Sequence, residues 1–268
     1  VIGVGADVQD VALGDAVLAL VPGGGYAEYV AVSAATIMRK PTTLSWAAAA
    51  SVPEAWLTAY QLVHLVGGVR AGEVVLIHAA ASGVGVAAIQ LVVAAGAYPV
   101  VTVGSSDKLE LCKRLGAVGG AVRHDGPWLE TVRGAAPGGK VHVVLDCVGA
   151  AYVAQNLEVL AIDGRWVLYS FLSGNALPAE LAPAFLATLF KKRIALLPTT
   201  LRSRPLPYKR DLVARFAANA LPRVADGTFS HVVDKEFAGL AEAQRAHEYM
   251  ESDANSGKIV LLVGAPPA

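Results

Sequence analysis

The segment Ser82-Gly83-Val84-Gly85-Val86-Ala87-Ala88 combines small residues at a spacing that suits the binding of phosphate groups. Gly83 permits a tight turn, and Gly85 has no side chain to keep the backbone away from a pyrophosphate. Ala88 allows a following helix to pack closely on the preceding strand. The free N–H groups in the first turn of that helix then face the phosphates. We therefore interpret the segment as the G-x-G-x-x-A form of a dinucleotide-binding turn.

The residues after the next predicted strand indicate which nicotinamide dinucleotide the turn accepts. NAD enzymes place an acidic residue about 20 positions further on, where it grips the ribose hydroxyls. Here the sequence reads Thr102-Val103-Gly104-Ser105, so no carboxylate repels a 2′-phosphate. Ser105 can donate a hydrogen bond to that phosphate, and Lys108, one helical turn further, can pair with it. We expect a preference for NADP; the alternative is that Lys108 is only a solvated helix residue.

The elements that must position these residues begin in an apolar run. Residues 74–106 contain no Asp, Glu, Lys or Arg, and a membrane-spanning helix requires only about 20 residues. However, β-branched pieces at 74–77 and 100–103 flank a glycine-interrupted helical piece. Parallel strands that are covered on both faces have such continuous apolar sequences. We therefore favour a buried strand–helix–strand unit over a membrane span.

Strands and helices continue to alternate, which predicts an α/β fold with a doubly wound parallel sheet. The expected helices are 106–117, 127–134 and 151–161, and the expected strands are 119–122, 140–149 and 163–171. The flanks differ, because 14–32 shows short β-rich runs between turns and 257–263 is a single terminal strand. We predict a Rossmann domain at 54–197 and a second, partly β domain built from 1–53 and 198–268.

Composition excludes several function classes. Lys plus Arg and Asp plus Glu both number 22, so no basic surplus attracts nucleic acid or an anionic membrane. Cys112 and Cys147 are too few for a disulfide framework and lack the short spacing of a metal site. Both are expected in the core, in a reducing, cytoplasmic compartment. The sequence begins at Val1 without a signal-peptide pattern, so we expect an interior beginning.

Several segments together resemble one enzyme family over nearly the whole chain. They are GDAVLALVPGGGYAEYVAV, VPEAWLTAYQ, HAAASGVGVAAIQL, LDCVGAAY, DGRWVLYSF, LRSR and NSGKIV. The chain resembles the zinc-independent quinone oxidoreductases of the medium-chain dehydrogenase/reductase superfamily, and most of all the tumour-suppressor-inducible NADPH quinone oxidoreductases. This resemblance implies a GroES-like catalytic domain beside the Rossmann domain. It also implies a homodimer that pairs through the strand near 192–198.

The resemblance assigns residues to the cofactor. They are Ser82, Gly83, Val84, Gly85, Ser105, Lys108, Arg123, Cys147, Val148, Phe171, Leu172 and Asn255. The first four would hold the pyrophosphate, and Ser105 with Lys108 the adenosine phosphate. Arg123 stands where close relatives have a tyrosine, and its guanidinium could reach the same phosphate. The last five would line the nicotinamide side. Each of them also has an ordinary interpretation as a core or loop residue.

The implied activity is NADPH-dependent reduction of a quinone. The alternatives are reduction of a carbon–carbon double bond conjugated to a carbonyl, and NADPH binding without efficient turnover. The resemblance implies a longer segment before residue 14, with the tyrosine and asparagine that line the family's substrate pocket, so we assign no catalytic side chain. No cysteine run forms a structural zinc lobe, and the six His show no metal pairing at helical spacing, so we expect no metal.

Overall fold

The computed structural model describes residues 1–264. It divides the chain into two compact units. The first combines residues 1–58 with those from 201 onward, and the second comprises residues 59–200. Helix α2 (Pro53–Tyr60) contains the first boundary. The predicted boundaries, after 53 and after 197, differ from this division by a few residues.

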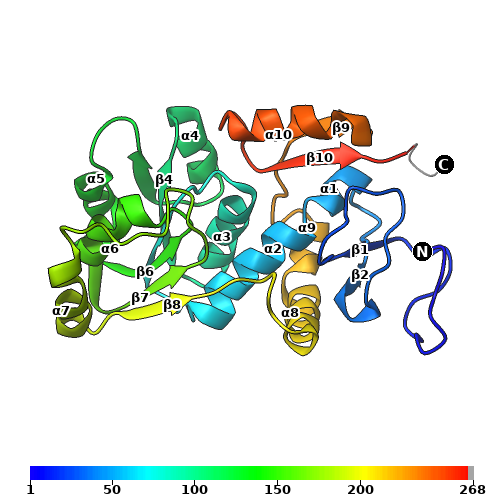
Figure 1. Cartoon of the computed structure of the whole chain (residues 1–268), viewed down its shortest axis with the longest axis horizontal. Coiled ribbons are helices and arrows are strands. Elements are labelled where there is room, and N and C mark those ends of the chain that lie inside the picture. The colour runs from blue at the N-terminus through cyan, green and yellow to red at the C-terminus, as the bar shows by residue number, and fades with distance from the viewer. Residues whose placement is uncertain (265–268) are drawn as a thin grey trace. The chain divides into compact units, whose positions relative to one another are not determined.

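The second unit is built on six parallel strands (Figure 1). They are β3 (Val74–Ile77), β4 (Tyr98–Val103), β5 (Gly119–Val122), β6 (Val141–Asp146), β7 (Leu160–Leu168) and β8 (Ala195–Pro198). Their order in the sheet is β5-β4-β3-β6-β7-β8. The chain therefore builds outward from β3 to β5 and then returns to lay β6 on the other side of β3. This order confirms the doubly wound sheet and makes the boundary between β3 and β6 its topological switch point.

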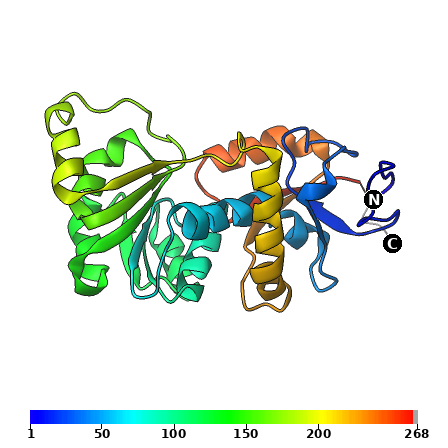
Figure 2. The same ribbon diagram turned by 90° about the horizontal axis from the view of Figure 1, so that it is seen from below.

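Helices cover both faces of this sheet (Figures 1 and 2). They are α3 (Gly83–Ala94), α4 (Ser106–Arg114), α5 (Trp128–Ala135), α6 (Val153–Val159) and α7 (Ala182–Lys192), with the π-helix η2 (Gln61–Val66) and the 3-10 turns η3 (Pro137–Gly139) and η4 (Ala150–Tyr152). Helices α5 and α6 pack on one face around the buried Trp166, with Phe185 of α7 against the same cluster. Helix α3 is almost wholly buried. Its lack of charged residues follows from that burial.

Several element boundaries differ from the prediction. Strand β6 ends at Asp146 rather than 149. The Asp146 carboxylate accepts hydrogen bonds from the N–H groups of Val148 and Gly149, and these bonds turn the chain. Strand β7 begins at Leu160 and continues through Asp163, which has a φ of 62°. Helix α4 ends at Arg114 rather than 117. Gly116 with a φ of 108° follows it, a left-handed conformation that favours glycine at a helix end.

The described residues of the first unit form two small sheets. Strand β1 (Val17–Ala19) pairs antiparallel with β2 (Ile37–Arg39), and β9 (Val233–Ala238) pairs parallel with β10 (Lys258–Leu262). Its helices are α1 (Trp46–Ala50), α8 (Leu206–Asn219), α9 (Leu221–Ala225) and α10 (Ala243–Glu251), with 3-10 turns η1 (Ala34–Thr36) and η5 (Leu240–Glu242). The predicted β-rich runs at 14–32 were mostly wrong, because residues 20–33 form bends and coil. Gly23-Gly24-Gly25 offers no side chain to pack, and strands lose stability at such positions.

The apolar run at 74–106 is the buried unit β3–α3–β4, as predicted. Within residues 1–264, no helix has the length and hydropathy needed to cross a membrane.

Candidate cofactor site

The glycine turn lies between the carboxyl end of β3 and the start of α3. Ala79 holds a φ of 48°, which reverses the chain after His78. Ser82 then forms the N-cap of α3, and its hydroxyl accepts a hydrogen bond from the Gly85 N–H at 3.2 Å. The four residues predicted to hold the pyrophosphate, 82–85, therefore gather at one helix N-terminus. This terminus follows the central strand, next to the switch point, where open α/β sheets bind their ligands.

Gly85 is required by the packing of the turn itself. A Cβ atom added to Gly85 would stand 2.5 Å from both the carbonyl carbon and the Cα of Ala80. Ala80 cannot retreat freely, since its N–H donates to the carbonyl of Thr102 at 3.1 Å. The first turn of α3 therefore packs directly against the backbone of Ala80. Glycine here keeps the N-terminal N–H groups close to the end of β3, which is the geometry that a bound diphosphate needs.

Three predicted residues lie at the ends of the neighbouring strands β4 and β5. Ser105 is the N-cap of α4 and accepts a hydrogen bond from the Lys108 N–H at 3.4 Å. The Arg123 N–H donates to the carbonyl of Val103 at 2.9 Å, which fixes Arg123 beside the end of β4. Its Nε donates to the ring of His124 at 3.1 Å. A hydroxyl and two cations therefore share one edge of the sheet, with chemistry that suits a phosphate.

The loops after β6 and β7 are joined along their backbones. The Leu172 N–H donates to the carbonyl of Cys147 at 2.9 Å, and the Ser173 N–H donates to that of Val148 at 2.8 Å. Three more hydrogen bonds tie Ala150, Ala151 and Val148 to Gly174 and Ser173. The structure thus brings together the four residues predicted for the nicotinamide side in this unit. Phe171 is 51% exposed and Leu172 is 73% exposed, so both side chains are accessible.

The Cys147 thiol faces inward. Cys147 is only 6% exposed, and its sulfur lies 3.9 Å from the carbonyl oxygen of His78. Burial raises the pKa of the Cys147 thiol to about 11 and that of Cys112 to about 12. Both cysteines are buried, as predicted. Because its side chain points into the core, Cys147 presents its backbone rather than its thiol to the loop surface.

Asn255 belongs to the first unit, between α10 and β10. Its amide donates to the carbonyl of Gly257 at 3.3 Å. The other predicted cofactor residues all belong to the second unit.

Sequence reasoning missed a buried polar network beneath the carboxyl ends of the strands. It consists of His78, Thr102, Asp146, Asn156 and Trp166, all buried. The signal was present, because His78 directly follows the apolar strand β3 and Asp146 is the last residue of β6. A buried polar side chain at the end of a parallel strand requires partners.

The network fixes the tautomer of His78. The amide nitrogen of Asn156 donates to Asp146, so its oxygen faces the His78 Nε2 at 2.8 Å. The Nε2 therefore carries the proton, and the Nδ1 accepts from the Thr102 hydroxyl at 2.8 Å. Burial lowers the pKa of His78 against the opposing effect of Asp146, which keeps the ring neutral.

The donor sets of residues 1–264 do not fit a metal ion. Within this range, no three His, Cys, Asp or Glu side chains gather closely enough to bind one. Catalytic and structural zinc sites need three or four such ligands.

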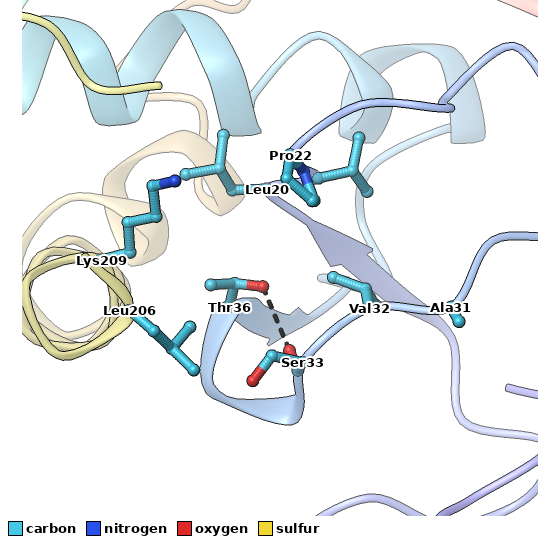
Figure 3. Close-up of a pocket in the computed structure, with 9 residues that line it drawn as sticks. Leu20, Pro22, Ala31, Val32, Ser33, Thr36, Leu206 and Lys209 are labelled. Atoms are coloured by element: carbon cyan, nitrogen blue, oxygen red, sulfur yellow. Dashed lines mark hydrogen bonds between the residues drawn. The ribbon is translucent and has the colours of Figure 1, made fainter. Parts of the chain in front are cut away.

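The first unit holds a cavity of about 260 Å³ (Figure 3). Its lining residues are Leu20, Val21, Pro22, Ala31, Val32, Ser33, Thr36, Leu206 and Lys209. Figure 3 shows the Lys209 side chain at its margin, where the ammonium donates to the carbonyl of Arg202 at 2.8 Å. None of the predicted cofactor residues lines this cavity.

Comparison with known proteins adds independent evidence. Residues 83–218 match the family described as zinc-binding dehydrogenase. A phenolphthiocerol/phthiocerol polyketide synthase from Mycobacterium tuberculosis is 31% identical over 98% of this chain. The chain spans only 12% of that protein's length.

Two solved structures share both fold and sequence with the chain. The quinone oxidoreductase from Coxiella burnetii is 30% identical, with a TM-score of 0.78 over 98% of this chain and 76% of that one. The Escherichia coli quinone oxidoreductase complexed with NADPH is 27% identical, with a TM-score of 0.82 over 97% of this chain and 79% of that one.

Proposed function

The chain belongs to the zinc-binding dehydrogenase family, and from that premise we propose that it binds NADPH and reduces a quinone. The observation that carries the proposal is the position of the α3 N-terminus. It stands at the switch point of the sheet, where the absence of a side chain on Gly85 lets it lie close to Ala80. The likeness to an NADPH-bound quinone oxidoreductase supports the same cofactor and acceptor.

The residues of the second unit divide the binding of the cofactor. Residues 82–85, at the N-terminus of α3, hold the diphosphate. Ser105, Lys108 and Arg123 bind the 2′-phosphate at the ends of β4 and β5. The joined loops 147–148 and 171–172 form a wall beside the nicotinamide. The backbone hydrogen bonds between the two loops fix the shape of this wall. When bound, NADPH supplies a hydride, and the quinone also takes up one proton to become a hydroquinone.

A quinone suits a site for which no acid side chain is assigned. Hydride addition to a quinone gives a delocalised oxyanion, which is easier to protonate than an alkoxide. The proposal gives no part to zinc, because residues 1–264 offer no donor set for it. We further propose a cytoplasmic homodimer that pairs through β8, one of the two edge strands of the sheet.

The test is the loss of NADPH absorbance in the presence of a quinone. Wild-type protein should oxidise NADPH, and Gly85→Asp should abolish the reaction, because the new carboxylate would fill the turn and repel the diphosphate. Gly134→Ala is the matched control, since a Cβ there meets no atom within 4 Å. Circular dichroism must show that both variants are folded. Unchanged rates in a folded Gly85→Asp protein would contradict the proposed site.

The likeness to a polyketide synthase favours a second candidate. It is NADPH-dependent reduction of a carbon–carbon double bond conjugated to a carbonyl, which needs the same hydride geometry as quinone reduction. Turnover of a quinone and of an enone by the same preparation distinguishes the two. Cofactor binding without oxidation by either acceptor would identify an NADPH-binding protein instead.

A further inference from the structure

Asp146 links the loop that follows β6 to the rigid part of the second unit. Its Oδ1 accepts hydrogen bonds from the N–H groups of Val148, at 2.7 Å, and Gly149, at 3.1 Å. Its Oδ2 accepts hydrogen bonds from Asn156 and Trp166, both at 3.0 Å. One carboxylate oxygen therefore holds the loop and the other holds α6 and β7.

The scaffold side of this link is buried and fully connected. Asp146 and Asn156 are 0% exposed, and Trp166 is 2% exposed. Asn156 is held in turn by His78, and His78 by Thr102 of β4. The hydrogen bonds thus link β4, the residue that follows β3, α6, β6 and β7. Satisfied buried networks of this kind resist rearrangement.

The loop side of the link reaches the loop after β7. Gly149 has a φ of 83°, and a Cβ on it would stand 2.7 Å from the carbonyl oxygen of Gly174 and 3.1 Å from the Phe171 ring. The two loops also share the backbone hydrogen bonds of Leu172 and Ser173 described above. A displacement of residues 147–149 would therefore displace Phe171 and Leu172 as well.

From this arrangement, we propose that Asp146 is a positioning residue that sets the wall formed by residues 147–149 and 171–174 against the nicotinamide. The inference rests on the proposed function and names the residue that holds that part of its site. Aspartate is needed because four donors converge on the side chain. An asparagine at this position would replace one acceptor oxygen with an NH₂ group, which would face two of these four donors without accepting from them.

Hydrogen exchange in the cofactor-free wild-type protein gives the first test, and it needs no variant. The amides of Val148 and Gly149 should exchange as slowly as those of β6, because their acceptor is a buried carboxylate. Exchange at the rate of an exposed loop would overturn the proposal.

Asp146→Asn gives the second test. Loss of hydrogen bonds to a charged group should speed amide exchange in 147–149 and 171–174 about ten- to hundredfold, with β3 and β4 unchanged. Adding Asn156→Asp should restore slow exchange in part, since the new carboxylate accepts from the new amide. Asp163→Asn makes the same chemical change at an exposed residue paired with Arg193 and should leave both loops unchanged. A folded Asp146→Asn protein with wild-type exchange in both loops would overturn the proposal.

Steady-state kinetics give the third test. Asp146→Asn should lower kcat about tenfold or more, because the nicotinamide is misplaced, and should change the KM for NADPH less than about threefold, because the phosphate contacts remain. A raised KM with unchanged kcat would overturn the positioning role. If wild-type protein neither binds nor oxidises NADPH, the proposed function fails, whereas the exchange experiments still decide whether Asp146 orders the loops.

Discussion

The Cα of Ala80 lies where a side chain on Gly85 would have to go, only 2.5 Å from the position of its Cβ. Gly85→Ala must therefore push α3 away from β3. Overpacking of this kind costs about 1–3 kcal/mol, and we expect the upper end of that range because the obstacle is backbone. Urea denaturation measures the loss. Gly134→Ala, in α5, should instead leave stability unchanged or raise it by about 0.5–1 kcal/mol. Equal stability of the two variants would contradict the contact.

A second prediction concerns Arg165 of β7 and Glu73, which directly precedes β3. The Arg165 guanidinium donates to the carbonyls of Gly67, at 2.8 Å, and Gly68, at 2.7 Å, and also to the Glu73 carboxylate. Arg165→Met leaves all three acceptors short of a donor. We expect a loss of about 2–4 kcal/mol at neutral pH, measured by denaturant unfolding. Arg215→Met removes an exposed i,i+4 pair and should cost less than about 0.5 kcal/mol.

The same pair predicts the acid limb of the stability curve. Burial raises the pKa of Glu73, but the hydrogen bonds from Arg165 and from the Arg70 N–H outweigh it and lower the pKa below its ordinary 4.5. A lowered folded pKa gives stability that is complete above the unfolded pKa and is lost as the pH falls through the folded pKa. Glu73→Gln should therefore flatten the fall in unfolding free energy below about pH 4.5. An unchanged slope would show that Glu73 titrates alike in both states.

The sequence predicts the second unit well because its elements are set by local patterns. The apolar pieces at 74–77 and 100–103 are buried on both faces, and this burial identifies them as parallel strands. The hydrogen bonding between the loops 147–149 and 171–174 could not be predicted, because it joins the backbones of positions far apart in sequence. The partners of Asp146 likewise come from α6 and β7. At 20–33, β-rich composition misled because strand formation there depends on pairing that composition does not specify.

The buried His78 predicts that the unfolding free energy also depends on pH above the range in which Glu73 titrates. Burial lowers the pKa of His78, so the unfolded chain takes up a proton that the folded ring does not. The unfolding free energy should therefore fall as the pH drops below about 6.5, and one histidine contributes at most about 1.4 kcal/mol per pH unit. His78→Phe should remove that contribution to the slope while lowering stability at all pH values, because Thr102 and Asn156 lose their partner.

His64 supplies the comparison for this experiment, because burial lowers its pKa as well. His64→Gln should remove only its own part of the slope and leave that of His78. If His78→Phe retains the full wild-type slope between about pH 6.5 and pH 5, then His78 is protonated in the folded protein and the assigned tautomer is wrong.

Lys108 determines the choice of dinucleotide if the 2′-phosphate lies between the ends of β4 and β5. A charge-assisted hydrogen bond to a phosphate is worth about 1.5–3 kcal/mol, which corresponds to about ten- to hundredfold in affinity. Lys108→Ala should weaken NADPH binding by that factor and change NADH binding less than about threefold, since NADH has no phosphate there. Lys113→Ala is the matched control, because Lys113 belongs to the last turn of the same helix and pairs with Glu110 at 2.8 Å. Titration of both cofactors against both variants measures the difference, and added salt should shrink it. If Lys108→Ala weakens NADPH and NADH binding equally, Lys108 does not bind the 2′-phosphate. Arg123→Ala, tested in the same way, would then show whether Arg123 at the end of β5 binds it alone.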